Sequence, residues 1–251
     1  KGPAQLRRAG IPAVEGPLAA EARDFNAPYL TWVAEGRPLV TAKWAMTLDG
    51  KLATRAFDSR WISGEASRRM AHGLRNTVDA VMVGSGTVLA DDPLLTCRSP
   101  GGRTPLRVIL DRRGRAPLNA RVFATRAQGP VIVYTARAGY ARALAARGID
   151  AVRAGRAGGR GALAEILRDL GGRGIQHLLL EGGATLLGAF FDARLVDRVV
   201  VFVAPKIAGG AAAPAPVGGL GVKNMDDARP LRVRRTLRAG PDIVWWADVL
   251  R

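Results

Sequence analysis

Short apolar runs alternate with amphipathic stretches through most of this chain, from Arg37 to Leu250. The runs have the length and β-branched content of buried strands, whereas the stretches between them repeat apolar residues at helical spacing. We predict strands at residues 39–46, 79–84, 106–110, 131–134, 149–152, 175–180 and 198–204, and helices at about 63–75, 139–147, 161–170 and 184–192. Apolar strands that alternate with helices indicate an α/β fold with a mostly parallel sheet.

Two segments depart from this alternation. After a loop rich in Gly, Ala and Pro, residues 231–237 and 243–250 have the pattern of two antiparallel strands. Residues 1–36 are polar and interrupted by proline, with a short helix expected at 19–24 and a break at 26–28. We therefore expect a linker at 1–36, the remnant that follows a missing domain, and one folded domain at 37–251.

The helix predicted at 63–75 has a clear start and a clear apolar face. Ser63 is positioned to cap its first turn, and Ala66, Met70, Ala71 and Leu74 share one side.

The composition is that of a folded protein, with 48% hydrophobic and 24% charged residues. The longest apolar runs are far shorter than the roughly 20 residues of a membrane span, so no membrane partner is expected. No secretory signal is visible, and we expect the protein in the cytoplasm. A single cysteine, Cys97, excludes an intramolecular disulfide, and the two histidines, His72 and His177, lack metal-ligand spacing. We expect no metal.

The formal charge of +17 favours anionic ligands such as nucleotides, phosphosugars or nucleic acid. The basic residues are spread along the chain, without the basic block or aromatic platform of nucleic-acid-binding proteins, so no specific nucleic-acid partner is expected. A non-catalytic nucleotide- or nucleic-acid-binding module remains the alternative to an enzyme.

Lys43 lies within an otherwise apolar strand. Such a lysine either extends its amine to solvent or meets an anion or acceptor that offsets its desolvation. Further along, Gly84, Ser85 and Gly86 follow a strand and precede Thr87, a position where backbone amides can meet phosphate. Asp91 then offers a general acid beside the pocket, unless the Asp-Asp-Pro sequence is only a turn.

The segment 178–190 is the clearest ligand turn. An apolar strand ends at Glu181, two glycines permit close approach of the backbone, and a helix begins near Ala184, which suits a pyrophosphate. The same pattern can be an ordinary strand-to-helix connection. At 110–115 another strand ends in arginines, including Arg112, which can accommodate a 2′-phosphate and favour NADPH over NADH, unless they are solvated loop charges.

Taken together, these motifs resemble a known family. Residues 37–251 are similar to the reductase domain of riboflavin biosynthesis, the carboxyl-terminal half of the bifunctional diaminohydroxyphosphoribosylaminopyrimidine deaminase/5-amino-6-(5-phosphoribosylamino)uracil reductase. The matching motifs are K-x-A-x-T-L-D-G-K at 43–51, SRWIS at 59–63, GSGTVLADDPLLTCR at 84–98 and LEGG at 180–183. Residues 1–36 resemble the connector that follows the deaminase domain. One cysteine and two distant histidines cannot form that domain's zinc site, so the chain is either an excised domain or works with a separate deaminase.

The resemblance implies a dihydrofolate-reductase-like fold, a homodimer, and NADPH-dependent reduction of the substrate's ribosyl group to ribityl. By matching position it implies an NADPH site formed by Ala45, Trp61, Thr87, Asp91, Arg112, Gly183, Ala184, Thr185, Leu186, Leu187, Gly188 and Ala189. It implies contacts with a small phosphoribosylaminopyrimidine from Ser59, Arg75, Leu95, Arg98 and Glu181.

Chemically, a closed ribofuranosyl ring has no hydride acceptor, so the sugar must open to an imine whose C1′ accepts hydride. Asp91, with Lys43 or Glu181 nearby, is the candidate for the proton transfers, and these three are the predicted catalytic residues. The substrate is expected to be 5-amino-6-(5-phosphoribosylamino)uracil. The alternative is the undeaminated 2,5-diamino-6-(ribosylamino)pyrimidinone 5′-phosphate.

Overall fold

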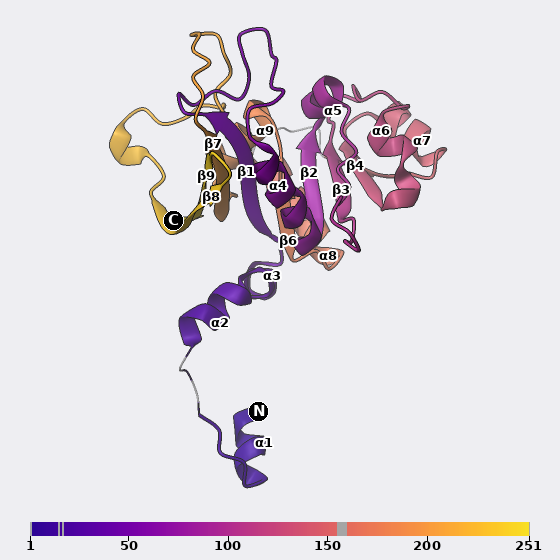
Figure 1. The fold of residues 1–251 in the computed structure, drawn as a ribbon. Helices are drawn as coiled ribbons and strands as arrows, with labels where there is room; N and C mark the ends of the chain where they lie inside the picture. Colours follow the sequence, from indigo (N-terminus) through magenta and orange to yellow (C-terminus); the bar gives the residue numbers. More distant parts are fainter. Residues whose placement is uncertain (1, 15, 17, 155–159, 251) are drawn as a thin grey trace.

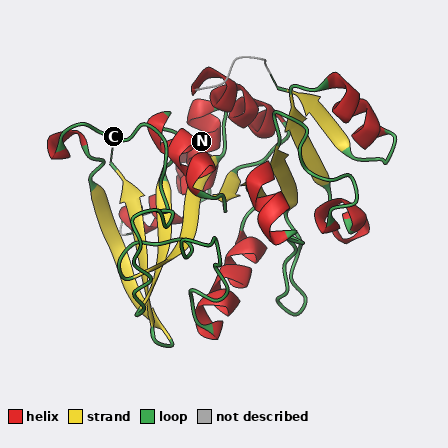
Figure 2. Cartoon of the chain, turned by 90° about the horizontal axis from the view of Figure 1, so that it is seen from above, coloured by secondary structure: helices red, strands yellow, loops and turns green. Residues whose placement is uncertain are grey.

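The computed structural model describes residues 2–14, 16, 18–154 and 160–250. In this part of the chain, nine strands form one sheet in the order β5-β4-β3-β2-β6-β1-β7-β9-β8, with helices on both faces (Figures 1 and 2). The strands are β1 (Leu39–Thr47), β2 (Ala80–Gly84), β3 (Leu106–Leu110), β4 (Val131–Thr135), β5 (Asp150–Arg153), β6 (His177–Leu180), β7 (Arg198–Ala204), β8 (Leu231–Ala239) and β9 (Asp242–Val249). The helices are α1 (Gly2–Arg8), α2 (Ala19–Phe25), α3 (Ala27–Glu35), α4 (Glu65–Thr77), α5 (Ser85–Asp91), α6 (Arg121–Ala124), α7 (Ala138–Ala145), α8 (Arg160–Gly172) and α9 (Ala184–Asp192), with 3-10 turns η1 (Arg126–Gln128) and η2 (Met225–Asp227).

The order of the strands determines where a ligand can enter. Strands β1 to β7 run parallel, and β9 and β8 extend the sheet in antiparallel orientation beyond β7. Strand β6 comes late in the chain but lies between β1 and β2. Its insertion brings the carboxyl ends of β1, β2 and β6 together, and open α/β sheets bind ligands at such an edge.

Alternation along each strand divides the core into two layers. In β6, Leu178 and Leu180 pack with residues of α8 and α9, whereas Leu179 packs with residues of α4, α5, α6 and α7. Strand β1 shows the same alternation, with Val40 and Ala42 on the α8–α9 side and Ala45 on the opposite side. The middle of the sheet, from β4 to β7 in the strand order, is therefore covered on both faces, which explains why its strands are almost continuously apolar, whereas β8 at the end of the sheet is mostly exposed.

Each predicted strand is present, with ends displaced by no more than one or two residues. The four predicted helices are also present, and Ala66, Met70, Ala71 and Leu74 of α4 pack on the sheet as one face.

The predicted cap at Ser63 is wrong, because α4 begins one residue later, after Gly64. The carboxylate of Asp242 takes the role of a cap: its Oδ2 accepts hydrogen bonds from the Gly64 N–H at 2.7 Å and from Ser67 Oγ at 2.5 Å. An acceptor from a distant strand cannot be found in the local pattern.

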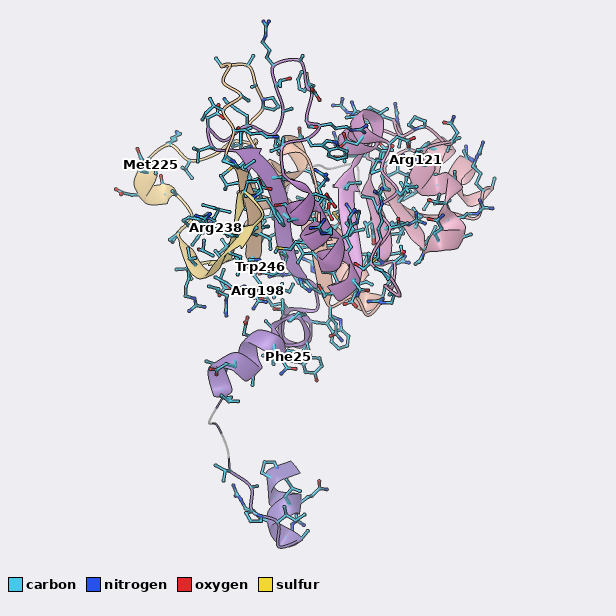
Figure 3. The ribbon with its side chains drawn as sticks, viewed as in Figure 1. Phe25, Arg121, Arg198, Met225, Arg238 and Trp246 are labelled. Atoms are coloured by element: carbon cyan, nitrogen blue, oxygen red, sulfur yellow. The ribbon has the colours of Figure 1, made fainter. Side chains whose placement is uncertain are left out.

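The segment predicted as a linker contains helices that contact the rest of the protein. The break expected at 26–28 is the junction of α2 and α3, where Pro28 sits in the first turn of α3, a position that favours proline. Trp32 Nε1 donates a hydrogen bond of 2.8 Å to the carbonyl oxygen of Gly171 in α8. Asp24 forms ion pairs with Arg234, at 3.1 Å, and with Arg198, which is labelled in Figure 3 with the exposed Phe25.

Helix α1 differs from α2 and α3. It has no buried residue and lies apart from the sheet in Figure 1. No helix in the described ranges has the length and apolar character that crossing a membrane requires.

Candidate active site

A cleft of about 680 Å³ opens at the carboxyl ends of β1, β2 and β6. Its wall is formed by the ends of these strands, the first turns of α5 and α9, one side of α4 and the loop at 52–63. The volume lies within the range of ~300–1,000 Å³ that is typical of small-molecule sites.

Three charged side chains meet at the base of the cleft. Strands β1 and β6 pair in register with Ala42 opposite Leu180, so the following residues, Lys43 and Glu181, extend to the same face of the sheet. The Lys43 Nζ lies 3.9 Å from Glu181 Oε2. Arg75 of α4 binds both oxygens of Glu181, with Nε to Oε1 at 2.7 Å and Nη2 to Oε2 at 2.8 Å. Nothing in the sequence spacing indicates this bidentate pair.

Burial and mutual attraction determine the ionisation of this cluster. Burial alone would raise the pKa of Glu181, but Arg75 and Lys43 outweigh it and lower that pKa to about 2. Burial lowers the pKa of Lys43, an effect that Glu181 opposes. Burial, followed by repulsion from Arg75 and Arg98, lowers the pKa of nearby His72 to about 4. At neutral pH the cluster therefore contains an ionised Glu181 and a neutral His72.

Two helices begin at adjacent positions of the cleft wall. Strand β2 leads through Gly84 into α5, and neighbouring strand β6 leads through Glu181 to Gly183 into α9. Neither helix has a side chain that caps its first turn. A Cβ at Gly182 would lie 2.8 Å from the Cβ of Leu186, so only glycine fits the turn as it stands. Uncapped amides at two neighbouring helix starts provide donors for phosphate oxygens.

Asp91 is the last residue of α5 and lines the same cleft. Its backbone carbonyl accepts a hydrogen bond of 3.4 Å from Arg60 Nη2. Burial raises the pKa of its carboxyl group, against the attraction of Arg60. The neighbouring Asp92 has a left-handed backbone (φ 39°) and accepts the backbone N–H of Arg121 at 2.8 Å, so it serves the turn. Of the two adjacent acids, Asp91 therefore lies at the cleft, where a general acid is needed, and Asp92 belongs to the turn.

Arg107 holds this loop from beneath. It is fully buried on β3 and donates to the carbonyl oxygens of Leu94, at 3.2 Å, and Thr125, at 3.0 Å, and to Thr125 Oγ1, also at 3.0 Å. The local sequence does not reveal this role, because an arginine within an apolar strand has the same pattern as Lys43.

The loop at 52–63 forms part of the cleft wall. Trp61 is exposed, and the guanidinium of Arg68 stacks 4.5 Å from the centre of its ring. Lys206, in the loop after β7, donates a hydrogen bond of 2.6 Å to the carbonyl oxygen of Trp61. Arg68 and Phe57 line the cleft although sequence reasoning did not single them out.

Most of the predicted site residues line this one cleft, although they come from distant parts of the chain. They are Lys43, Ala45, Ser59, Trp61, Arg75, Thr87, Asp91, Leu95, Glu181, Gly183, Ala184, Thr185, Leu186 and Ala189.

Four predicted residues are not among those that line the cleft. Leu187 is fully buried in the core. Gly188 packs against another loop so closely that a Cβ would lie 2.3 Å from the backbone of Gly218. Arg98 and Arg112 are exposed outside the cleft wall. From the arginine-rich loop at 110–115, Arg115 lines the cleft instead, with Nη2 3.5 Å from Ser85 Oγ.

Comparison with known proteins gives consistent matches. A family model described as the RibD C-terminal domain matches residues 38–245. Riboflavin biosynthesis protein RibD of Actinobacillus pleuropneumoniae is 36% identical over 97% of this chain and 65% of its own length. The 2,5-diamino-6-ribosylamino-4(3H)-pyrimidinone 5′-phosphate reductase of Methanothermobacter thermautotrophicus is 40% identical over 83% of this chain and 96% of its own length.

Among solved structures, a diaminohydroxyphosphoribosylaminopyrimidine deaminase/5-amino-6-(5-phosphoribosylamino)uracil reductase from Thermotoga maritima matches all of this chain and 67% of its own, with a TM-score of 0.85 and 31% identity. The likeness confirms the predicted fold class, a mostly parallel sheet flanked by helices with an antiparallel pair at the end. The chain spans just under two thirds of the length of the Actinobacillus relative.

Proposed function

The chain belongs to the RibD C-terminal domain family, and we propose that it reduces the ribosyl group of a phosphoribosylaminopyrimidine to ribityl, with NADPH, in riboflavin biosynthesis. The Methanothermobacter relative supports this proposal, because this chain matches nearly its whole length and that protein is named as a reductase. The domain that the two chains share is therefore the one to which we assign the reductase activity.

The observation that carries the proposal is the joint composition of the cleft. One cavity holds two uncapped helix starts, suited to a diphosphate, and the buried Lys43–Glu181–Arg75 cluster. A binding module for nucleotides needs the first feature only. A lysine and a carboxylate in contact at the base of the same cleft are expected in an enzyme whose reaction includes proton transfer.

The residues present fit a nicotinamide dinucleotide phosphate. Amides at the starts of α5 and α9 would hold its diphosphate, Thr87 and Ala45 would line its path, and Arg115 would meet the 2′-phosphate. When bound, the cofactor supplies the hydride that reduces C1′ of the opened sugar. Ionised Glu181, held by Arg75, would accept hydrogen bonds from sugar hydroxyl groups, and Ser59 and Leu95 line the same cleft.

Asp91 and Lys43 are the groups suited to proton transfer. Burial moves their pKa values in opposite directions, raising that of Asp91 and lowering that of Lys43, so each comes closer to neutral pH. We assign the donor that opens the sugar ring to Asp91, and proton exchange at the base of the cleft to Lys43. Glu181, with a pKa of about 2, stays ionised and is a positioning group in this scheme.

We test the function by following NADPH oxidation with the two pyrimidine substrates offered separately. The proposal expects saturable turnover, with 5-amino-6-(5-phosphoribosylamino)uracil preferred. A preference for the undeaminated diaminopyrimidine, the substrate form in the name of the Methanothermobacter relative, would change the substrate and keep the reaction. No turnover with either, while NADPH binds, would reject the reductase. Salt-dependent DNA binding without NADPH binding would favour the non-catalytic module.

A further inference from the structure

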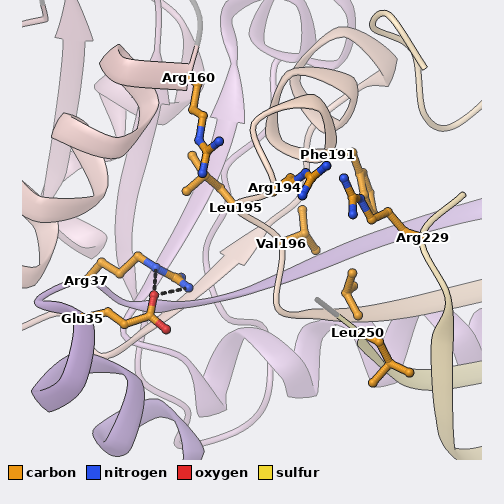
Figure 4. Close-up of a pocket in the computed structure, with 10 residues that line it drawn as sticks. Glu35, Arg37, Arg160, Phe191, Arg194, Leu195, Val196, Arg229 and Leu250 are labelled. Carbon is orange, nitrogen blue, oxygen red and sulfur yellow. Dashed lines mark hydrogen bonds and ion pairs between the residues drawn. The ribbon is translucent and has the colours of Figure 1, made fainter. Parts of the chain in front are cut away.

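A second pocket lies at the opposite edge of the sheet from the cleft, beside the amino-terminal ends of β1 and β7 (Figure 4). It has a volume of about 260 Å³. Four arginines and one glutamate line it, together with apolar residues of α9, β9 and the α9–β7 connection. The charged residues are Glu35, Arg37, Arg160, Arg194 and Arg229.

The acidic groups at this pocket are already engaged. Arg37 is nearly buried and binds both oxygens of Asp197, with Nη1 to Oδ2 at 2.7 Å and Nη2 to Oδ1 at 2.8 Å. Arg37 Nε also donates to Glu35 at 2.9 Å. The charge of Arg37 is thus balanced by these two carboxylates. The positive charges of the other three arginines are not balanced by them.

Arg160, Arg194 and Arg229 form no ion pair and no side-chain hydrogen bond with any other residue in the described ranges. In Figure 4, the guanidinium of Arg229 extends toward that of Arg194, and Arg160 of α8 lines the same pocket beside Leu195. Converging like charges repel unless an anion lies between them, and the guanidinium fork matches phosphate oxygens well.

The general richness of this chain in basic residues does not explain the cluster. Lys and Arg together are 38 of 251 residues, whereas arginine alone is four of the ten residues that line the pocket. The floor is apolar, formed by Phe191, Leu195 and Val196, and an apolar floor strengthens charge interactions above it.

We propose that this pocket binds a small phosphorylated anion, held by Arg194, Arg229 and Arg160. The volume is below the ~300 Å³ at which pockets for drug-sized ligands begin, which suits a pyrophosphate or a phosphomonoester. The site is separate from the cleft, since the two share no lining residue. Its occupation does not depend on the reductase activity.

Calorimetric titration of the full chain with inorganic pyrophosphate, at physiological salt, tests the proposal. The double variant Arg194→Gln/Arg229→Gln removes two charges at the pocket. The matched control, Arg121→Gln/Arg147→Gln, removes two charges from α6 and from just beyond α7, away from both cavities. Each titration is repeated with saturating NADPH, so that binding in the cleft is recognised by competition.

With NADPH present, we expect one saturable site that is weakened roughly tenfold or more in the pocket variant and is unchanged in the control. If pyrophosphate affinity falls equally in both variants, the fall reflects the lower net charge of the protein, and the proposed site is rejected. Binding that NADPH abolishes, or that the pocket variant leaves intact, would assign pyrophosphate to the cleft. Absence of saturable binding would also reject the proposal. Far-ultraviolet circular dichroism checks that both variants are folded.

Discussion

Glu181 is a buried carboxylate that two cations share, and its removal tests the base of the cleft. Glu181→Gln leaves Arg75 and Lys43 buried beside a neutral amide, and breaking a buried pair from one side costs about 3–5 kcal/mol. We expect urea unfolding at pH 7 to show a loss of this order. The control is Glu65→Gln, whose partner Arg69 is exposed and four residues away in α4; it is expected to lose less than about 1 kcal/mol.

The pH dependence of the same variant has a definite sign. The folded protein lowers the pKa of Glu181 from its ordinary value of 4.5 to about 2. Its stabilising contribution is therefore complete above pH 4.5 and is lost as pH falls toward 2. The difference in stability between the wild type and Glu181→Gln should shrink over that interval, and a constant difference would contradict the assignment.

Asp91 gives the opposite kind of prediction. Because burial raises its pKa, its charge does not stabilise the fold, and Asp91→Asn should unfold at the wild-type temperature or slightly above. As the proton donor it should matter greatly for turnover, with kcat reduced roughly 100-fold and NADPH affinity little changed. The decline of wild-type kcat with rising pH should disappear in the variant. Unchanged kcat would remove Asp91 from the chemistry.

Variants of Arg115 and Arg112 test which arginine of the loop at 110–115 binds the 2′-phosphate of NADPH. The sequence favoured Arg112 for the 2′-phosphate, whereas Arg115 lines the cleft beside Ser85. We expect Arg115→Gln to raise KM for NADPH roughly tenfold, with little effect on KM for NADH, and Arg112→Gln to leave the preference intact. Steady-state kinetics with both cofactors measure this. A larger rise in KM for NADPH in Arg112→Gln than in Arg115→Gln would assign the 2′-phosphate to Arg112 instead.

Among the elements, α8 provides a close test of packing. A Cβ at Gly171 would lie 2.2 Å from the carbonyl oxygen of Gly36, whereas a Cβ at the next residue, Gly172, meets nothing within 4 Å. Gly171→Ala must push α8 away from the α3–β1 junction and should destabilise by about 1–3 kcal/mol. Gly172→Ala, its neighbour on the same helix, should be neutral or stabilising by up to about 1 kcal/mol. Equal thermal unfolding of the two variants would disprove the packing.

The elements also show what a local pattern can and cannot specify. The strands β1 to β4, β6 and β7 were predicted nearly to the residue because each is largely buried and is bounded by turn residues, so apolar runs mark it. Helix α3 was missed because Pro28 was interpreted as a break, although proline is equally favoured in a first helical turn. The start of α4 was misplaced because its cap, Asp242, comes from β9.

At the scale of the whole molecule, the sequence predicts what lies at each strand end but not which ends meet. Lys43, Thr87 and Glu181 were assigned to one site through family resemblance, and β6 between β1 and β2 is the arrangement that unites them. The bidentate grip of Arg75 on Glu181 depends on how α4 crosses the sheet. The cluster of Arg160, Arg194 and Arg229 brings together α8, the α9–β7 connection and the segment before β8, so no local pattern could reveal it.

The amino-terminal segment allows a last prediction about the extent of the folded unit. Helix α1 has no buried residue, so deletion of residues 1–17 should leave the melting temperature and NADPH oxidation unchanged. Deletion of residues 1–36 also removes the Trp32 hydrogen bond to Gly171 and the ion pairs of Asp24. Together these contribute about 2 kcal/mol, which corresponds to a fall of roughly 4–8 °C in Tm for a chain of this size. If the longer deletion melts like the full chain, α2 and α3 are a passive linker, as the sequence alone indicated. If the shorter deletion already melts early, the boundary lies before α2, and the folded unit includes the whole segment.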